Sequence, residues 1–383
     1  MTPVELSRTV LRAVRRAVDD GELDVGVPAA VKVTPPGPGG CGDYATNLAL
    51  QLAGPAGQPP LRVAEILRTR LLHSDGIGDV VVTGPGFLNI SLQGEGSQAA
   101  LVREILEAGE RYGHVERPTG QLVQLHAPHE VRAVVVMDAL ARVLRSQGAL
   151  VRTSCASRPE PEWAQVLGAP VDAHGPQGAP TRPGAPGAHG TPDTPTPLHI
   201  PVRPVPATPD PTPLGRDAAR WALLHPAAHD RPRVTADHLV QRESNPLFRV
   251  RYAHARTRAL SRNAADLGFH AEPGPLETPA PGIPARDTRT QPPTAHPPTT
   301  LLTTLAAHPR TLQAVAAHHA PDRLARHLVT VADAALPFLL TVLPRGAEKP
   351  SAAHCARLAL AEAVGAVLAG GLSLLGIDAP EHL

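Results

Sequence analysis

The chain has 383 residues, enough for two or three domains, and its formal net charge is +1. A charge so near zero excludes a protein-wide positive field, so any binding of nucleic acid must depend on local groups of basic residues. Aromatic residues make up only 2%, whereas 45 residues are proline and 33 are glycine, so part of the chain cannot build a dense core. The three cysteines form no CxxC pair, which is typical of free thiols in a reducing cytoplasm.

No segment predicts a membrane span. The N-terminus lacks the apolar stretch of a signal peptide, and the longest apolar run, about 358–377, is interrupted by Glu362 and Gly370-Gly371. We therefore expect a cytoplasmic protein without a membrane partner.

Residues 1–117 predict a small α+β domain. Helical spacing is found in VELSRTVLRAVRRAV, in DYATNLALQLA and in PLRVAEILRTRLL, which Pro60 opens. The stretch DVVVTGPGFLNISLQ predicts two strands around the turn Gly84-Pro-Gly86, and a helix closes the domain.

Residues 118–167 predict a single strand–helix–strand unit, with strands QLVQLHA and ALVRTSC around one helix. Proline-rich segments follow at 168–213 and again at 272–298, and we expect both to be disordered linkers. Residues 214–383, apart from the loop 272–298, predict an all-α bundle. Its central helix follows Pro246, and its last helix starts near Ala352.

The stretch NPLFRVRYAHAR, residues 245–256, begins that central helix. Between Glu243 and Asp266 the sequence has no acidic residue but five arginines: Arg249, Arg251, Arg256, Arg258 and Arg262. Uncompensated arginines beside Tyr252 and His254 suit phosphate contact and base stacking. The alternative interpretation is an ordinary solvated amphipathic helix.

The same stretch resembles the DALR-type anticodon-binding domain of arginyl-tRNA synthetases, as do GRDAARWALL before it and ARLALAEAVGAVLAGGLSLLGIDAPEH at the end. The segments GDYATNLALQLA and GPGFLNISL resemble the family's N-terminal domain, which is expected to grip the tRNA elbow. The resemblance implies tRNA contacts by Arg220, Arg249, Arg251, Tyr252, His254, Arg256, Arg258, Tyr44, Asn47, Phe87 and Asn89.

Between these two ends, the family's catalytic parts are reduced. Five strands of a nucleotide-binding domain need on the order of 150 residues at about 30 per unit, more than residues 120–213 offer. The family's HIGH-type motif falls on Ala127-Pro-His-Glu130, or on His126-Ala-Pro-His129 with one inserted residue. Pro128 then replaces the glycine that lets ATP approach the backbone. No lysine between Lys32 and Lys349 is present for a KMSK-type loop, so we interpret His126 and His129 as a structural remnant.

Three hypotheses remain. The first is a tRNA-binding protein, with tRNA(Arg) a candidate, that lacks aminoacylation and needs no cofactor or metal. The second is a minimal arginine–tRNA ligase, active alone or with a protein partner, which would use ATP and Mg²⁺. The third is a protein-interaction or regulatory module on the same scaffold.

Overall fold

The computed structural model describes residues 3–34, 36, 43–74, 76–92, 94–176, 197–276 and 297–383. The chain divides into two compact units, each built from separate stretches of sequence. Unit 1 comprises Met1–Glu104, His270–Ala306 and Pro344–Leu360, and unit 2 comprises Ile105–Phe269, Ala307–Leu343 and Ala361–Leu383.

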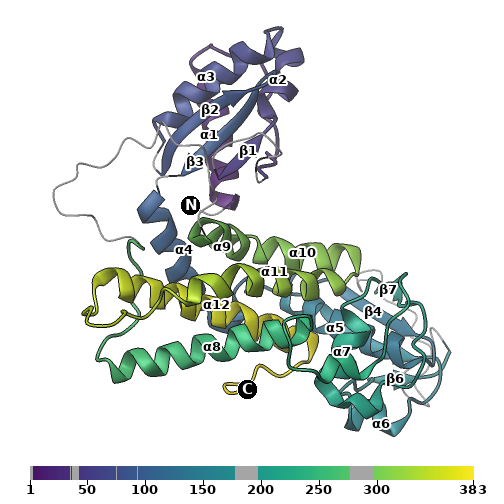
Figure 1. The fold of residues 1–383 in the computed structure, drawn as a ribbon. Coiled ribbons are helices and arrows are strands. Elements are labelled where there is room, and N and C mark those ends of the chain that lie inside the picture. Colours follow the sequence, from purple (N-terminus) through teal and green to yellow (C-terminus); the bar gives the residue numbers. More distant parts are fainter. Residues whose placement is uncertain are drawn as a thin grey trace. The chain divides into compact units, whose positions relative to one another are not determined.

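Unit 1 contains the predicted α+β fold (Figure 1). Its three antiparallel strands lie in the order β1-β3-β2, and three helices accompany them. The bounds are α1 (Pro3–Asp19), β1 (Tyr44–Thr46), α2 (Leu48–Ala56), α3 (Pro60–Leu72), β2 (Ile77–Thr83) and β3 (Phe87–Leu92). Leu6, Leu67 and Leu88 are completely buried in one continuous core, which the helices and the sheet share.

The turn between β2 and β3 is the one that the sequence predicts. Gly84 and Gly86 have φ angles of +53° and +134°, a region that favours glycine. A Cβ on Gly86 would also lie 3.1 Å from the main-chain oxygen of Pro60, so a side chain there would be strained and crowded.

The helix predicted from Asp43 to Ala53 starts later than expected. Residues 44–46 form β1, with Tyr44 opposite Ile90, and α2 begins only at Leu48. The Asp43 carboxylate accepts a hydrogen bond from the main-chain N–H of Leu92 at 2.8 Å, which fixes the strand instead of capping a helix. Pairing with β3 therefore overrides the local helical pattern.

Unit 2 carries a second sheet of four parallel strands in the order β6-β5-β4-β7. Strands β4 (Leu122–Ala127) and β5 (Leu150–Cys155), joined by α5 (Val131–Ser146), form the predicted strand–helix–strand unit. The short helix α6 (Pro161–Gln165) leads from β5 toward β6 (Ala173–His174).

The assignment of residues 168–213 to a linker needs correction, because this segment contains β6 and β7 (Leu198–Pro201). Strand β7 pairs with the side of β4 that β5 leaves open, so the strand order reverses beside β4, as at the switch point of a doubly wound sheet. Pro201 is tolerated because β7 is an edge strand. Residues 177–196 and 277–296, the rest of the two predicted linkers, lie outside the described residues.

The helices of unit 2 are α7 (Gly215–Leu224), α8 (Pro246–Asp266), α10 (His308–His318) and α11 (Asp322–Leu339), with the short turns η1 (Gly109–Arg111), η2 (Thr212–Leu214) and η3 (Ala236–Leu239). Helix α9 (Pro297–Ala306) belongs to unit 1, and α4 (Gly94–Ala108) and α12 (Ala352–Leu375) contain residues of both units. Helix α8 buries Val250, Ala253, Leu260 and Ala264 as predicted, but Leu267 is exposed just beyond its end.

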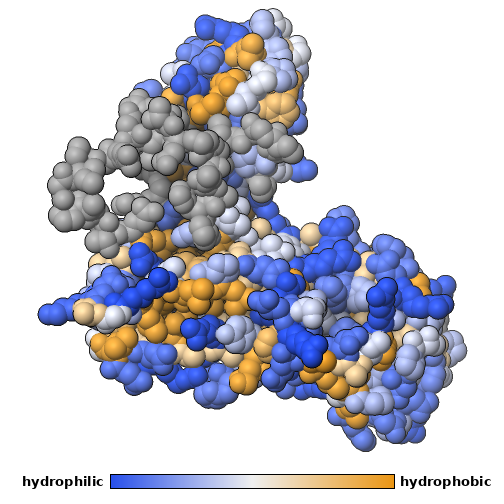
Figure 2. Space-filling model, in the orientation of Figure 1, coloured by the Kyte–Doolittle hydropathy of each residue, from blue (hydrophilic) through white to orange (hydrophobic). Residues whose placement is uncertain are grey.

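Helix α12 is long and apolar enough to cross a membrane by length and composition alone. Within the protein, 83% of its most apolar window is buried, as in a core helix. On the face shown in Figure 2, apolar residues gather over α12, whereas hydrophilic residues prevail over the end of unit 2 that carries α6 and β6.

Candidate nucleic-acid interface

The Asn245-Pro246 pair determines where α8 begins. The Asn245 side-chain oxygen accepts the N–H of Leu247 at 3.1 Å, and Pro246 occupies the first helical position. The Asn245 amide group also donates to the main-chain oxygens of His238 and Val240 at 3.0 and 2.9 Å. This part of the NPLFRVRYAHAR motif therefore has a structural role.

The arginine strip of α8 is neutralised by acidic residues from other elements. Arg249 forms an ion pair with Asp333 of α11 at 3.2 Å, and Arg251 pairs with Asp217 of α7 at 3.3 Å. Near the C-terminus, Glu381 pairs with Arg258 at 2.9 Å. The prediction of uncompensated arginines is therefore wrong for these three of the five, because the acids come from segments far away in the sequence.

Two of the predicted RNA contacts on α8 remain accessible without an acidic partner. Tyr252 is 41% exposed, and its ring stacks on Phe248 with centroids 5.6 Å apart. Arg256 is half-buried and has no ion pair among the described residues. An exposed aromatic ring beside a guanidinium is suited to stacking on an unpaired base.

His254, in contrast, is directed inward. Only 4% of the residue is exposed, and its Nδ1 lies 3.0 Å from the main-chain oxygen of Pro380. Burial lowers the pKa of His254, so its ring is neutral around pH 7. The expectation that His254 contacts RNA is therefore corrected: it joins α8 to the C-terminal segment.

A cavity of about 300 Å³ lies beside the N-terminal turns of α8. Phe248 and Leu247 supply apolar walls, while Arg216, Arg251 and His238 supply polar atoms. A space of this size with an aromatic wall suits a nucleotide base. Asp217 and Asp378 also line it and form ion pairs with Arg251 and Arg216, so a phosphate there would have to replace a carboxylate.

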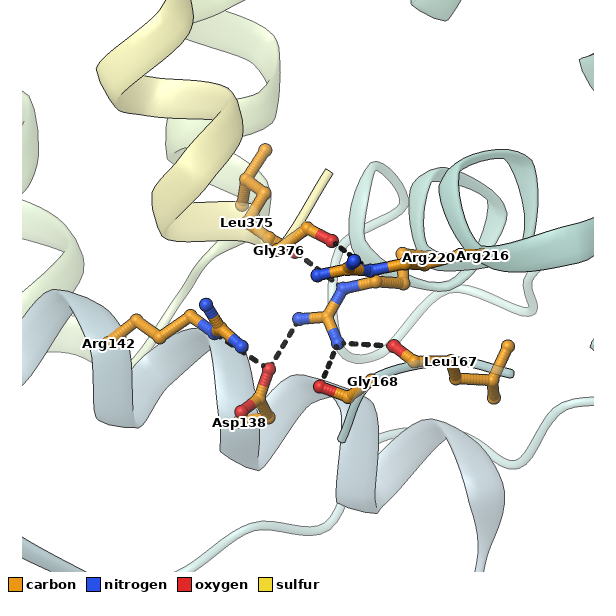
Figure 3. A network of polar contacts seen from close by, with 8 residues as sticks. All are labelled: Asp138, Arg142, Leu167, Gly168, Arg216, Arg220, Leu375 and Gly376. Atoms are coloured by element: carbon orange, nitrogen blue, oxygen red, sulfur yellow. Dashed lines mark hydrogen bonds and ion pairs between the residues drawn. The ribbon is translucent and has the colours of Figure 1, made fainter. Parts of the chain in front are cut away.

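Arg220, the arginine of the DALR-like segment, is also unavailable to RNA. Its side chain is fully buried, and Nη2 lies 2.6 Å from the Asp138 carboxylate (Figure 3). It further donates to the main-chain oxygens of Leu375 at 2.7 Å and Leu167 at 2.9 Å. The assignment of Arg220 to the RNA surface is wrong, because nearly all its donors are used inside the protein.

The surroundings of this pair join α5, α7 and the end of α12. Arg142 donates from Nε to the same Asp138 oxygen at 3.0 Å, and Arg216 donates to the main-chain oxygen of Gly376 at 3.2 Å (Figure 3). A Cβ on Gly376 would lie 2.5 Å from the Arg220 guanidinium. Glycine is therefore required here both for space and for its φ of +70°.

Of the four RNA contacts predicted in unit 1, two residues are buried and two are exposed. Tyr44 and Asn89 are buried, and the Asn89 amide group donates to Thr83 Oγ1 at 2.6 Å. These two are corrected to core residues. Asn47 and Phe87 are exposed, so they remain available to a partner.

His126 and His129 lie at the end of β4 and in the turn before α5. His126 Nδ1 is 2.9 Å from Ser154 Oγ on the neighbouring strand, and burial, together with Arg203, lowers its pKa. The ring of His129 lies 4.9 Å from that of Trp163, and its Nε2 is 3.0 Å from the main-chain oxygen of Arg158. Each ring therefore has a partner within the protein.

Comparison with known proteins identifies the two ends of the chain. A model described as "Arginyl tRNA synthetase N terminal domain" matches residues 5–92, and one described as "DALR anticodon binding domain" matches residues 250–383. The chain carries domains of the arginyl-tRNA synthetase family at both ends.

Similarity to individual arginyl-tRNA synthetases covers only part of each protein. The arginine–tRNA ligase of Frankia alni is 42% identical over 158 residues, which are 39% of this chain and 28% of that protein. The enzyme of Renibacterium salmoninarum is 43% identical over 165 residues, again 39% of this chain and 30% of the relative. The matches thus span less than a third of the relatives' length.

Solved arginyl-tRNA synthetases share the fold at low sequence identity. The Thermus thermophilus structure has a TM-score of 0.61 at 15% identity, with both chains covered completely. The Plasmodium falciparum structure has a TM-score of 0.64 at 8% identity, covering 100% of this chain and 99% of that one.

Two residues that organise the surroundings of α5 were not predicted from the sequence. Arg132 is fully buried and donates five hydrogen bonds to main-chain oxygens, those of Leu223, Val205, Asp230, Pro226 and Ala227, at 2.7–3.1 Å. Glu130 caps α5 by accepting the N–H groups of Arg132 and Ala133. The signal was a charged pair, Glu130 and Arg132, directly before the apolar run 133–137.

Proposed function

We propose that this chain binds tRNA and does not form an aminoacyl adenylate. The observation that carries the proposal is the position of the Glu130 carboxylate. Its oxygens accept the N–H groups of Arg132 at 3.0 Å, Ala133 at 2.7 Å and Ala207 at 3.0 Å. The N–H groups of Arg132 and Ala133 lie at the N-terminus of α5 beside the switch point, where doubly wound sheets bind phosphate. A phosphate here would have to displace a carboxylate and would be repelled by it.

The chain itself also fills the space beyond β4 and β7. The N–H of Val202 donates to the oxygen of His126 at 2.8 Å, and Val205 is bonded through its N–H to Ala228 and through its oxygen to Arg132, both at 2.8 Å. Pro128 stands in the turn where a glycine would admit ATP. These residues do not fit ATP and Mg²⁺, and we assign them no step of a ligase reaction.

Support for tRNA binding comes from unit 2. The match to the anticodon-binding model covers α8, which exposes Tyr252 next to Arg256 and lies beside the cavity lined by Phe248 and Arg251. We propose that unpaired bases stack on Tyr252 while Arg256 contacts phosphate. Arg249, Arg251 and Arg258 would contribute only by exchanging a carboxylate for a phosphate. A cytoplasmic location remains a prediction.

The test combines three assays on the same purified chain: charging with radiolabelled arginine, ATP–pyrophosphate exchange, and filter binding of a tRNA(Arg) transcript at two salt concentrations. We expect binding that weakens as salt rises, with neither exchange nor charging. Arginine-dependent charging above the no-enzyme background would show that the proposal is wrong.

A second candidate function is arginine–tRNA ligase. It is favoured by the curated relatives, which carry that name, and by the strand order, which retains a switch point between β4 and β7. This function would need ATP and Mg²⁺ and a partner that completes the nucleotide site. The third hypothesis, a protein-interaction module, predicts co-purification with protein and no retained RNA.

A further inference from the structure

Helix α1 has two chemically different sides. One side places Leu6, Val10, Val14 and Ala17 in the core of unit 1. The other exposes four arginines: Arg8, Arg12, Arg15 and Arg16. The spacing of four and three residues aligns Arg8, Arg12 and Arg15 on one face, over about 10 Å of helix at 1.5 Å per residue.

No acidic side chain among the described residues forms an ion pair with these four arginines. Three nearby acids of unit 1 bind arginines of α3 instead: Arg70 binds Asp20 at 2.7 Å and Glu22 at 2.8 Å, and Glu65 binds the arginine at position 68 at 3.2 Å. Asp19, at the end of α1, forms no ion pair among the described residues. Within the same residues, the one side-chain hydrogen bond of the four arginines is between Arg12 Nη2 and Thr9 Oγ1, at 3.0 Å. The charge of this face is therefore not neutralised within unit 1.

Arg8, Arg12 and Arg15 also line a surface hollow of about 450 Å³, together with Leu11 and one acid, Glu5. On α8, by contrast, Arg249, Arg251 and Arg258 are each paired with Asp or Glu. Guanidinium groups that need not give up an internal carboxylate bind phosphate at a lower cost.

We propose that Arg8, Arg12, Arg15 and Arg16 of α1 form a docking face for the phosphate backbone of a structured RNA. This inference rests on the proposed function and assigns the main electrostatic contact to unit 1, away from the predicted contacts Asn47 and Phe87. Helix α1 has no aromatic residue, so this face offers charge without base stacking. It therefore fits paired RNA, whose bases are enclosed, better than a single strand.

The observations favour RNA over an anionic membrane. A helix that lies on a membrane inserts its apolar side, but α1 has already buried that side in the protein core. Val4 is the exposed large apolar residue of α1, which is too little for insertion.

The experiment measures binding of a fluorescently labelled tRNA transcript to the full chain over a series of KCl concentrations. The variant R8Q/R12Q/R15Q is compared with R117Q/R231Q/R233Q, which removes the same charge from exposed arginines of unit 2. We expect the first variant alone to lower the slope of log K against log [salt] by about two to three, at roughly 0.7–0.9 per lost contact. R8K/R12K/R15K should retain the slope, because charge and not shape carries the contact.

An unchanged slope in R8Q/R12Q/R15Q would overturn this inference while leaving tRNA binding intact. Failure of the unmodified chain to bind the transcript at low salt would overturn the proposed function and this inference with it. Binding to phosphatidylglycerol vesicles, lost in the same variant and without RNA binding, would assign the face to a membrane and reject the RNA proposal. Circular dichroism verifies that the variants keep their helix content.

Discussion

Asp138 of α5 and Arg220 of α7 form a buried ion pair whose Nη2 and Oδ2 atoms are 2.6 Å apart. Both residues lie in motifs that resemble an arginyl-tRNA synthetase, and each is less than a tenth exposed. Their pairing fastens α5, which accompanies the four-stranded sheet, to the helical part of unit 2, together with the five bonds of Arg132. The family resemblance at these positions thus reflects packing within the protein.

Replacing Arg220 by methionine should therefore lower stability without a specific effect on RNA. The change leaves the Asp138 charge in a buried site with Arg142 as its remaining partner, so we expect a loss of about 3–5 kcal/mol in chemical denaturation. Arg216→Met, at a side chain that is 42% exposed, is the matched control and should cost less than about 1 kcal/mol. Equal losses in the two variants would contradict the structural role.

Arg132→Lys should be destabilising even though it keeps the charge. An ammonium group has three donors and cannot reach the five main-chain oxygens that Arg132 now satisfies, so we expect a loss of about 3 kcal/mol or more. Arg145→Lys on the same helix, where the side chain is 47% exposed, should change the urea midpoint little.

The chain should lose stability as pH falls from about 7 to 4. Burial lowers the pKa of His308 to about 3 and that of His327 to about 4, and their rings lie 5.2 Å apart, with His114 nearby. The unfolded chain binds these protons near pH 6.5 and the folded chain does not, so stability is fully present above pH 6.5. At pH 5 the inability of each buried ring to bind a proton should have lowered the free energy of unfolding by about 2 kcal/mol.

The measurement is the urea midpoint from pH 7.5 to 4.5 for the unmodified chain and for H308Q/H327Q. The double variant should show a shallower pH dependence, whereas His318→Gln, at an exposed ring, should follow the unmodified chain. Parallel curves for all three proteins would rule out the buried pair as the cause.

Removing the acids that neutralise α8 should strengthen RNA binding. In D333N/E381Q, Arg249 and Arg258 lose their carboxylate partners and become available to phosphate. We expect tighter binding of a tRNA transcript and a salt slope steeper by roughly one to two. E116Q/E162Q, which removes equal charge from exposed residues of unit 2 that form no ion pair among the described residues, is the control. If both variants gain the same affinity for the transcript, the effect is due only to the change in net charge.

Tyr252→Ala should weaken binding with little change in the salt slope. Stacking of a base on an aromatic ring contributes about 1–3 kcal/mol, and the tyrosine carries no charge to release counterions. The control is Tyr252→Phe, which keeps the ring and should bind normally. A loss of affinity in both variants would indicate that the hydroxyl group, and not stacking, matters.

Much of the local structure could be predicted from the sequence. The spacing of apolar residues determined α1, α3, α8 and α12, and the glycines of Gly84-Pro-Gly86 determined the β2–β3 turn, because these features depend on neighbouring residues alone. The motifs at the two ends determined the family. Strand β7 lies inside a proline-rich segment and is a strand because it pairs with β4. That pairing is between distant residues, so the local sequence pattern does not predict it.

Only the tertiary structure decided which motif residues face solvent. Arg220, His254, Tyr44 and Asn89 have the residue types of RNA contacts, yet each is buried. Distant segments supply the partners of Arg220 and His254, Asp138 and Pro380, whereas Asn89 bonds to Thr83 across the β2–β3 hairpin. Arg249, Arg251 and Arg258 of α8 have no acid near them in the sequence but are paired with acids in space, whereas the arginines of α1 have no ion pair within the described part of the chain. The sequence gives the order of the charged residues, but ion pairing depends on spatial separations of a few ångströms, which only the fold creates.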